Sequence, residues 1–374
     1  MLTVHGIPSG TVTLPSSKSV AHRALICSFL AGGSDVIING QGNDILATRS
    51  CLEAMQSDPC VLDCRDSGST LRFLMPVAAA LGLDATFRTG GQLAARPVSE
   101  FRELIEAHKT GGRLQSGDYS ISGNVSSQYV SGLLMALPLL DGDSTVSIDG
   151  PCESVPYINM TISVLKRFGI EISDGYKVCG GQKYTSPGTF AVEGDWSAAA
   201  FWLVAGCTGQ GMELKGLDWN SGLQGDSRIA DILKSMGGDI SDGIARPSEL
   251  HGITVDCRDI PDLVPAIAVA AAKAQGQTVL TGIHRLRYKE SDRVSSIIGL
   301  LRAFGIECSA THDCITITGG RPHEAVVRTY SDHRIAMAAA IMGDCTIDDA
   351  DCVAKSYPAF FDEMSRLGVK IERA

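Results

Sequence analysis

The chain contains six segments that follow one plan, and this internal repeat constrains the fold more than any other feature of the sequence. Each segment opens with polar or charged residues, continues as an apolar stretch rich in small residues, and ends at Gly or Asp. The openings lie about 50–70 residues apart, which indicates a protein built from repeated supersecondary units. The segments are Ser17–Gly32, Ser67–Gly82, Ser126–Asp141, Asp195–Gly206, Asp262–Gly276 and Asp332–Gly343.

A short strand and a second helix are expected after each apolar stretch. The strands, most with alternation or β-branched residues, are Asp35–Asn39, Ala85–Thr89, Ser144–Asp149, Met212–Gly216, Thr278–Gly282 and Cys345–Asp348. The second helices are Asp44–Gln56, Val98–Thr110, Tyr157–Phe168, Ser227–Met236, Asp292–Phe304 and Pro358–Leu367. Strand material closes most units, for example Gly169–Ser173 and Gly305–Cys308. Each unit therefore reads strand–helix–strand–helix–strand, with an extra strand in most.

The six units predict two domains of three units each, which agrees with the length of 374 residues. The last unit ends early, whereas the N-terminus offers spare strands at Leu2–His5 and Thr11–Leu14. We infer that both of these strands complete the last unit. The sequence therefore predicts an α/β protein with one domain over 15–192 and the other over 1–14 plus 193–374.

Composition and charge exclude several classes of protein. Hydrophobic residues make up 44% and charged residues 20%, which excludes intrinsic disorder, and the net charge of −10 argues against a general nucleic-acid binder. No apolar run is long enough to span a membrane, and no signal peptide is visible. The twelve scattered cysteines predict buried reduced thiols, and no metal-ligand spacing occurs. We expect a cytoplasmic monomer that needs no metal.

The polar openings require an explanation of their own. Helices such as Ala199–Ala205 and Ala266–Ala274 are apolar nearly all round, so they are expected to be buried on every face. Only their ends would then reach solvent. Helix N-termini that converge would form a donor-rich, positive surface that suits anions.

Three openings in the first half carry hydroxyls at helix starts, and two of them also carry cations. Lys18, Ser19 and Arg23 fall in the first, where Arg23 follows Ser19 by four residues. The second is Ser67-Gly68-Ser69-Thr70-Leu71-Arg72, and the third is Ser126-Ser127-Gln128. Such groups suit phosphate or carboxylate, although ordinary N-caps with surface cations would give the same pattern.

The second half contains the densest charge cluster, Arg287-Tyr288-Lys289-Glu290-Ser291-Asp292-Arg293. Such a run is usually a solvated face, but this one sits between a strand and a helix, where α/β sites form. The cations at unit starts are Lys18, Arg23, Arg72, Arg96, Lys289, Arg293, Arg334 and Lys355. In an acidic protein they predict an interdomain cleft for small polyanions, with Asp262 and Glu290 as acid–base candidates.

Several of these blocks, in this order, resemble the 5-enolpyruvylshikimate-3-phosphate (EPSP) synthase family over nearly the whole chain. They include Ser17-Lys18-Ser19, Ser67-Gly68-Ser69, Arg96-Pro97, Ser126-Ser127-Gln128, Ser154-Val155-Pro156-Tyr157, Gly194-Asp195-Trp196-Ser197, Gln224-Gly225-Asp226, Ile260-Pro261-Asp262, Lys289-Glu290-Ser291-Asp292-Arg293, Asp332-His333-Arg334 and Lys355-Ser356-Tyr357-Pro358. The resemblance implies two domains of three βαβαββ units, the inside-out α/β barrel of the enolpyruvyl transferases, with the active site in the interdomain cleft. It also implies transfer of the enolpyruvyl group of phosphoenolpyruvate to the 5-hydroxyl of shikimate 3-phosphate, without a cofactor.

The resemblance also implies residue roles. Shikimate 3-phosphate would be held by Ser19, Arg23, Ser126, Ser127, Ser154, Tyr157 and Lys289, with Asp262 beside its 5-hydroxyl. Phosphoenolpyruvate would be held by Lys18, Gly68, Arg96, Gln128, Arg293, Arg334 and Lys355. Asp262 would take the hydroxyl proton with help from Lys289, and Glu290, Lys355 and Lys18 are candidates for proton delivery at C3. No metal ion is expected in the site.

The sequence departs from the family pattern at Asp66, where the family usually has Asn. A carboxylate beside the phosphoenolpyruvate site is expected to weaken binding of that anion, and of glyphosate, which occupies the same subsite in the family. Two alternatives stay open: an enolpyruvyl transferase acting on UDP-N-acetylglucosamine, and a non-catalytic anion-binding relative. Release of inorganic phosphate in the presence of each acceptor separates the three.

Overall fold

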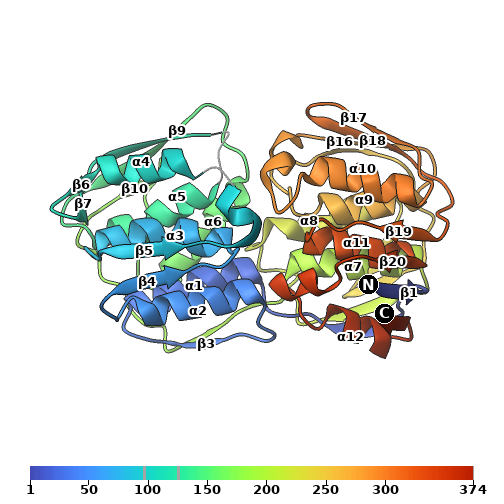
Figure 1. Cartoon of the computed structure of the whole chain (residues 1–374), viewed down its shortest axis with the longest axis horizontal. Helices are drawn as coiled ribbons and strands as arrows, with labels where there is room; N and C mark the ends of the chain where they lie inside the picture. Colours follow the sequence, from blue (N-terminus) through green and yellow to red (C-terminus); the bar gives the residue numbers. More distant parts are fainter. Residues whose placement is uncertain (96–97, 124–126, 374) are drawn as a thin grey trace. The chain divides into compact units, whose positions relative to one another are not determined.

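The computed structural model describes residues 1–95, 98–123 and 127–373, which form an α/β protein with mixed sheets (Figure 1). The chain folds as two compact units. The continuous unit is Lys18–Val192, and the discontinuous unit combines Met1–Ser17 with Glu193–Ala374.

The continuous unit alternates helices with short strands. Its helices are α1 (Lys18–Leu30), α2 (Asn43–Ala54), α3 (Gly68–Ala80), α4 (Ser99–Ala107), α5 (Ser127–Ala136) and α6 (Val155–Arg167). Its strands are β3 (Asp35–Ile37), β4 (Cys60–Asp63), β5 (Ala85–Arg88), β6 (Lys109–Thr110), β7 (Arg113–Leu114), β8 (Asp118–Ser122), β9 (Ser144–Asp149), β10 (Lys177–Val178) and β11 (Thr189–Ala191). Parallel pairs join β4 to β5, β8 to β9 and β3 to β11.

The discontinuous unit holds three four-stranded sheets. Its helices are α7 (Trp196–Thr208), α8 (Arg228–Ser235), α9 (Val264–Lys273), α10 (Arg293–Ala303), α11 (His333–Met342) and α12 (Phe360–Arg366). Its strands are β1 (Leu2–His5), β2 (Gly10–Thr13), β12 (Met212–Lys215), β13 (Asp239–Ser241), β14 (Ile244–Arg246), β15 (Thr254–Asp256), β16 (Gln277–Thr281), β17 (Cys308–Ala310), β18 (Cys314–Thr318), β19 (Ala325–Val327), β20 (Cys345–Ile347) and β21 (Lys370–Arg373). The sheet orders are β19-β20-β1-β21, β13-β14-β12-β2 and β15-β16-β18-β17.

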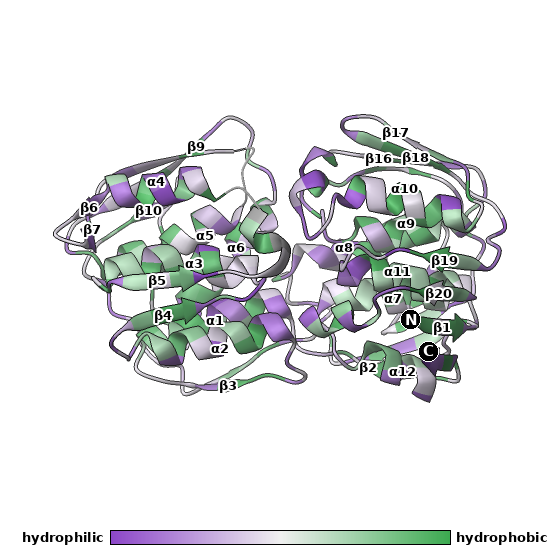
Figure 2. Cartoon of the chain, in the orientation of Figure 1, coloured by the Kyte–Doolittle hydropathy of each residue, from purple (hydrophilic) through white to green (hydrophobic). Residues whose placement is uncertain are grey.

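The apolar helices form the interior of each unit, as their composition predicts. Every residue of α11 is buried, and α3 is buried except at Ser69. Helix α9 is buried up to its last residue, Lys273, and its hydrophobic character is visible in Figure 2. A helix covered on all sides can present functional groups only at its ends. Functional groups on these helices are therefore expected at the helix ends, including the N-termini.

The two N-terminal strands join different sheets. Strand β1 lies between β20 and β21, with Leu2 opposite Ile347 and Arg373, so its place in the last unit is confirmed. The prediction for the next strand is wrong, because β2 pairs in parallel with β12 of the fourth unit. The short linker between β1 and β2 begins at Gly6, whose positive φ of 93° turns the chain from one sheet to the next.

The two closing strands begin later than predicted. Ser173 makes only an isolated bridge to Lys177, and strand β17 begins only at Cys308. Gly169 and Gly305 have φ values of 76° and 77° and form the turns that end α6 and α10. The chain must leave each helix through that turn before it can enter a strand, which shifts the strands toward the C-terminus.

The structure also bears on the expectations that the cysteines are buried and that no segment spans a membrane. All twelve cysteines are free thiols; seven are buried, whereas Cys179 is exposed and four others are partly exposed, so the expectation of burial is wrong for these five. Among the described residues, none of the helices combines the length and the hydropathy that a membrane span requires.

Candidate active site

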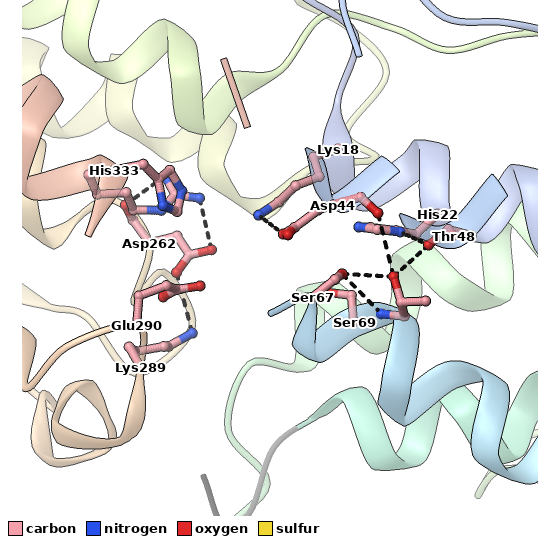
Figure 3. A network of polar contacts seen from close by, with 12 residues as sticks. Lys18, His22, Asp44, Thr48, Ser67, Ser69, Asp262, Lys289, Glu290 and His333 are labelled. Carbon is pink, nitrogen blue, oxygen red and sulfur yellow. Dashed lines mark hydrogen bonds and ion pairs between the residues drawn. The ribbon is translucent and has the colours of Figure 1, made fainter. Parts of the chain in front are cut away.

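Asp262 lies at the centre of a cluster of charged side chains in the discontinuous unit (Figure 3). Its Oδ1 is 2.9 Å from Nη1 of Arg293 and 3.3 Å from Nζ of Lys289. Its Oδ2 is 3.0 Å from Nη2 of Arg334. Three cations therefore converge on one carboxylate whose side chain is 19% exposed.

Helix starts position these groups. Asp262 lies in the turn before α9, which has Pro in its first turn, where Pro favours helix initiation. Asp292 caps α10 by accepting a hydrogen bond of 3.2 Å from the backbone N–H of Ser295. Asp332 caps α11 in the same way, at 3.0 Å from the N–H of Arg334. Arg293 and Arg334 thus occupy the first turns of their helices.

Arg293 connects the cluster to a second, fully buried carboxylate. Its Nε donates to Oδ2 of Asp332 at 2.8 Å, and its Nη2 donates to Oε2 of Glu290 at 2.5 Å. The hydroxyl of Ser291 donates to the same Asp332 oxygen at 3.1 Å. The guanidinium is therefore held in one orientation by three carboxylates, a geometry that pre-organises it.

The field of this cluster shifts its pKa values. Burial opposes ionisation of Asp262, but Arg334, Lys289 and Arg293 outweigh it and hold the pKa of that carboxyl well below its usual range. Burial is also the main influence on Lys289, and it lowers the pKa of the ammonium despite the opposing field of Asp262. Asp262 is therefore ionised at neutral pH, and Lys289 loses its proton more readily than an exposed lysine.

A further carboxyl group, Asp226, lies within the electrostatic reach of Asp262 and Arg334. It is buried and accepts a hydrogen bond from the hydroxyl of Ser197. Burial, followed by the negative charge of Asp262, raises the pKa of Asp226 to about 6. The Gln224-Gly225-Asp226 block was noted only for its resemblance to the family, because the chemistry of Asp226 depends on neighbours that are distant in the sequence.

In the continuous unit, Arg23 is buried among neutral oxygens. Its Nε donates to Oγ1 of Thr161 at 2.7 Å, and its Nη1 donates to the carbonyl of Ser19 at 2.7 Å. Its Nη2 donates to Oγ of Ser131 at 3.2 Å and to the carbonyl of Tyr157 at 3.1 Å. Burial lowers the pKa of Arg23 to about 10. Within the described part of the chain, this cation has hydrogen-bond acceptors but no counter-ion.

Lys18 and a chain of hydroxyl groups lie at the starts of α1, α2 and α3 (Figure 3). The ammonium of Lys18 is 2.9 Å from Oδ2 of Asp44, a buried carboxylate at the start of α2. Next to this pair, Nδ1 of His22 and the hydroxyls of Thr48, Thr70 and Ser67 form successive contacts of 2.7 Å each. These contacts fix the three helix starts relative to one another.

Gln128 connects α5 to α3. Its Nε2 donates to Oγ of Ser69 at 2.9 Å, and its Oε1 accepts from Nη1 of Arg72 at 3.0 Å. Gly68, the first residue of α3, follows the N-cap Ser67, whose hydroxyl accepts from the N–H of Thr70 at 3.3 Å. The amide of Gln128 therefore lies beside the N-terminal turn of α3.

The structure places the other predicted residues as follows. Ser127 is the buried first residue of α5, and Ser154, at φ 59°, directly precedes α6, whose first turn contains Tyr157. Lys355 is buried at the end of a short 3₁₀ helix. The predicted binding residues Arg96 and Ser126 lie outside the described residues.

Sequence reasoning missed the residues that hold the predicted ones in place. For Lys18, Arg23 and Arg293 these are Asp44, Ser131, Thr161 and Asp332, of which Asp332 was quoted in a motif but without this role. Asp332 carried a detectable signal, because it is a capping residue directly before an apolar helix. Ser131 and Thr161 carried none, because hydroxyl residues inside helices have no distinctive pattern.

Comparisons with known proteins show which family the chain resembles. The family model described as EPSP synthase (3-phosphoshikimate 1-carboxyvinyltransferase) matches residues 6–364. The 3-phosphoshikimate 1-carboxyvinyltransferase of Clostridium kluyveri is 38% identical, over 97% of this chain and 96% of that protein. That of Clostridium acetobutylicum is 37% identical, over 96% of this chain and 95% of that protein.

Solved structures extend the comparison to the fold. EPSP synthase from Acinetobacter baumannii superposes with a TM-score of 0.76 at 25% identity, over 100% of this chain and 99% of that chain. The enolpyruvyl transferase NikO from Streptomyces tendae has a TM-score of 0.74 at 17% identity, over 100% and 98%, and shows the shared fold alone. From the family match over nearly its whole length, we conclude that the chain belongs to the EPSP synthase family of transferases.

Proposed function

We propose that the chain transfers the enolpyruvyl group of phosphoenolpyruvate to the 5-hydroxyl of shikimate 3-phosphate and releases inorganic phosphate. This reaction belongs to the shikimate pathway of aromatic amino acid biosynthesis. The observation that carries the proposal is Arg23, a buried cation whose partners among the described residues are neutral. Such a group suits an anionic ligand, and both substrates carry phosphate and carboxylate.

Shikimate 3-phosphate is assigned to the surroundings of Arg23. Ser19 and Tyr157 lie there, because their carbonyls accept hydrogen bonds from its guanidinium. Ser127 and Ser154, at or next to helix starts, are assigned as donors to the same substrate, together with Lys289. Ser126 belongs to this set by family resemblance alone.

Phosphoenolpyruvate is assigned to two groups of residues. In the continuous unit these are Lys18, the backbone at Gly68, and Gln128, with Arg96 added by family resemblance. In the discontinuous unit they are Arg293, Arg334 and Lys355. Fixed cations of this kind also stabilise the negative charge that develops in an addition–elimination reaction.

The chemistry divides into addition and elimination. In the addition, the 5-hydroxyl oxygen bonds to C2 of phosphoenolpyruvate, Asp262 takes the hydroxyl proton, and C3 receives a proton. In the elimination, C3 loses a proton and the C2–phosphate bond breaks, which restores the double bond and releases phosphate. Glu290, Lys355 and Lys18 are the candidates for proton transfer at C3. A substrate anion that drew Arg334, Lys289 or Arg293 away from Asp262 would strengthen it as a base.

The finer architecture follows from the same family assignment. Each domain consists of three βαβαββ units arranged as an inside-out α/β barrel, with domains over 15–192 and over 1–14 plus 193–374. Both sets of assigned residues act on the substrates. The inner position of the six apolar helices supports the unit count. The enzyme works in the cytoplasm as a monomer.

Release of inorganic phosphate from phosphoenolpyruvate tests the proposal. Release is expected with shikimate 3-phosphate and not with UDP-N-acetylglucosamine. Asp262→Asn is expected to lower kcat by about 10²–10⁴-fold, the usual range for a general base. Asp256→Asn, in the exposed ion pair with Arg258, is the matched control and should leave kcat unchanged. Release only with the sugar nucleotide, or with neither acceptor, would contradict the proposal.

A further inference from the structure

The contact between Arg72 and Gln128 fixes the orientation of an amide at the proposed phosphoenolpyruvate site. An arginine side chain carries five N–H donors and no acceptor. The amide atom that lies 3.0 Å from Nη1 of Arg72 must therefore be the oxygen. The amide nitrogen then faces Ser69 and the N-terminal turn of α3, 2.9 Å from the Ser69 hydroxyl. Rotation of this amide by 180° would bring an acceptor to a place where an anion needs a donor.

The helix packing holds Arg72 itself in place. Helices α3 and α5 approach closely at Gly132, where an added Cβ would lie 2.4 Å from the backbone oxygen of Arg72. Pro76, four residues later in α3, has no N–H to donate to that oxygen. The close approach brings the guanidinium carbon of Arg72 to 5.6 Å from the ring centre of Tyr129. Gln128 and Tyr129 are neighbours on α5, so one residue of α3 contacts both.

The surroundings of Arg72 do not favour an arginine whose only role is to stabilise the fold. Its side chain is buried, and Nε has no hydrogen-bond partner among the described residues. The same part of the chain supplies no carboxylate to balance its charge. Burial of an unbalanced cation with an unused donor costs stability, whereas an apolar side chain of the same length would not. A role in function explains why a guanidinium stands here.

We infer that Arg72 is a positioning residue: it holds the amide of Gln128 so that its nitrogen donates toward the anionic substrate that binds at the start of α3. This assignment differs from the sequence-based expectation that Arg72 grips the anion itself. It rests on the proposed role of Gln128 in binding phosphoenolpyruvate.

A double-mutant cycle between Arg72→Met and Gln128→Met tests the inference. Arg72→Met keeps the apolar stem and removes the donor, and is expected to raise KM for phosphoenolpyruvate by about 10–100-fold, as for loss of a charged hydrogen bond. The KM for shikimate 3-phosphate should change by less than about twofold, which is the scatter between uncoupled sites. In the Gln128→Met background, the same Arg72 change should have little effect on KM for phosphoenolpyruvate. Equal effects in both backgrounds would overturn the inference, because Arg72 would then act on the anion without Gln128.

Two further measurements separate positioning from folding. The thermal unfolding midpoint of Arg72→Met without substrates is expected to equal or exceed that of the parent; a large decrease with unchanged KM would show a structural role instead. Arg113→Met is the matched control and should leave both KM values unchanged, because among the described residues Arg113 donates only to backbone carbonyls. If Arg72→Met does not fold, Arg72→Leu, which also lacks the donor, replaces it in the same cycle and is judged by the same criterion. An inactive parent protein would contradict the proposed function, and the double-mutant cycle is then measured in the Kd of phosphoenolpyruvate with the same criterion.

Discussion

Asp332 and Arg293 form an ion pair that is shut off from solvent: Oδ2 of Asp332 lies 2.8 Å from Nε of Arg293, and the two side chains are 0% and 1% exposed. Removing one partner of such a pair leaves a buried charge without compensation. Asp332→Asn keeps the shape and an oxygen that can still cap α11, so it removes mainly the charge. We expect it to lower the free energy of unfolding by about 3 kcal/mol. In this variant Arg293 still has Asp262 and Glu290 as partners. The expected loss of unfolding free energy is therefore near the low end of the range for broken buried pairs.

Urea denaturation without substrates measures this loss. The control is Asp256→Asn, which breaks an ion pair with Arg258 in which both side chains are about half exposed. Exposed pairs contribute about 0–1 kcal/mol, so the control should lie within that range. Equal losses in the two variants would show that burial does not determine the strength of the Asp332–Arg293 pair.

Asp226 predicts a pH dependence of stability. Its pKa is raised to about 6 in the folded chain, so the folded state holds this proton more tightly than the unfolded state does. The stability contributed by Asp226 is therefore fully present below the unfolded pKa of 3.8 and is lost as the pH rises to about 6. Asp226→Asn should be more stable than the parent above pH 6, by at most about 3 kcal/mol, and this advantage should shrink toward pH 4.

Urea denaturation of both proteins between pH 4 and pH 8 gives this difference. Asparagine can still accept the hydrogen bond from Ser197, so the comparison isolates the charge. A stability difference that does not change with pH would contradict the raised pKa.

Local patterns predicted the helices and strands of this fold well, because periodicity and capping act within a few residues. The predicted strand Ser144–Asp149 has the bounds of β9, and the predicted Leu2–His5 has those of β1. The partner of β2 could not be read in this way. Its pairing with β12 joins residues about two hundred positions apart, a distance that no local pattern spans.

The sequence predicted which cations belong to the candidate site, but it did not predict which side chains form hydrogen bonds and ion pairs with them. The Lys289–Arg293 block marked the anion-binding chemistry, since many charges directly before a helix are conspicuous in a sequence. That Asp262, Glu290 and Asp332 share the guanidinium of Arg293 depends on how three separate helix starts meet. The catalytic and substrate-binding roles carried over from the family stay predictions.

Asp66 is expected to weaken binding of phosphoenolpyruvate. It directly precedes Ser67 and Gly68 at the start of α3, so its negative charge lies next to the proposed anion site. Asp66→Asn should lower KM for phosphoenolpyruvate by about 3–10-fold, which corresponds to roughly 1 kcal/mol of like-charge repulsion. The inhibition constant of glyphosate should fall in parallel, because both anions meet the same charge. Steady-state kinetics at low salt measure both. Unchanged constants would show that Asp66 is neutralised in the folded enzyme.

Replacing Arg23 tests two effects of a buried cation, one on the stability of the substrate-free protein and one on binding of shikimate 3-phosphate. Arg23→Met should leave the free energy of unfolding of the substrate-free protein unchanged or higher, because the lost partners satisfy each other: the Thr161 hydroxyl lies 2.8 Å from that of Ser131 and 3.0 Å from the carbonyl of Tyr157. Shikimate 3-phosphate at a hundred times its Kd should stabilise the parent by about 2.7 kcal/mol. The same concentration should stabilise Arg23→Met little, whereas Arg113→Met should respond like the parent. Full stabilisation of Arg23→Met would remove Arg23 from the shikimate 3-phosphate site, and the neutral surroundings of this cation would then need another cause.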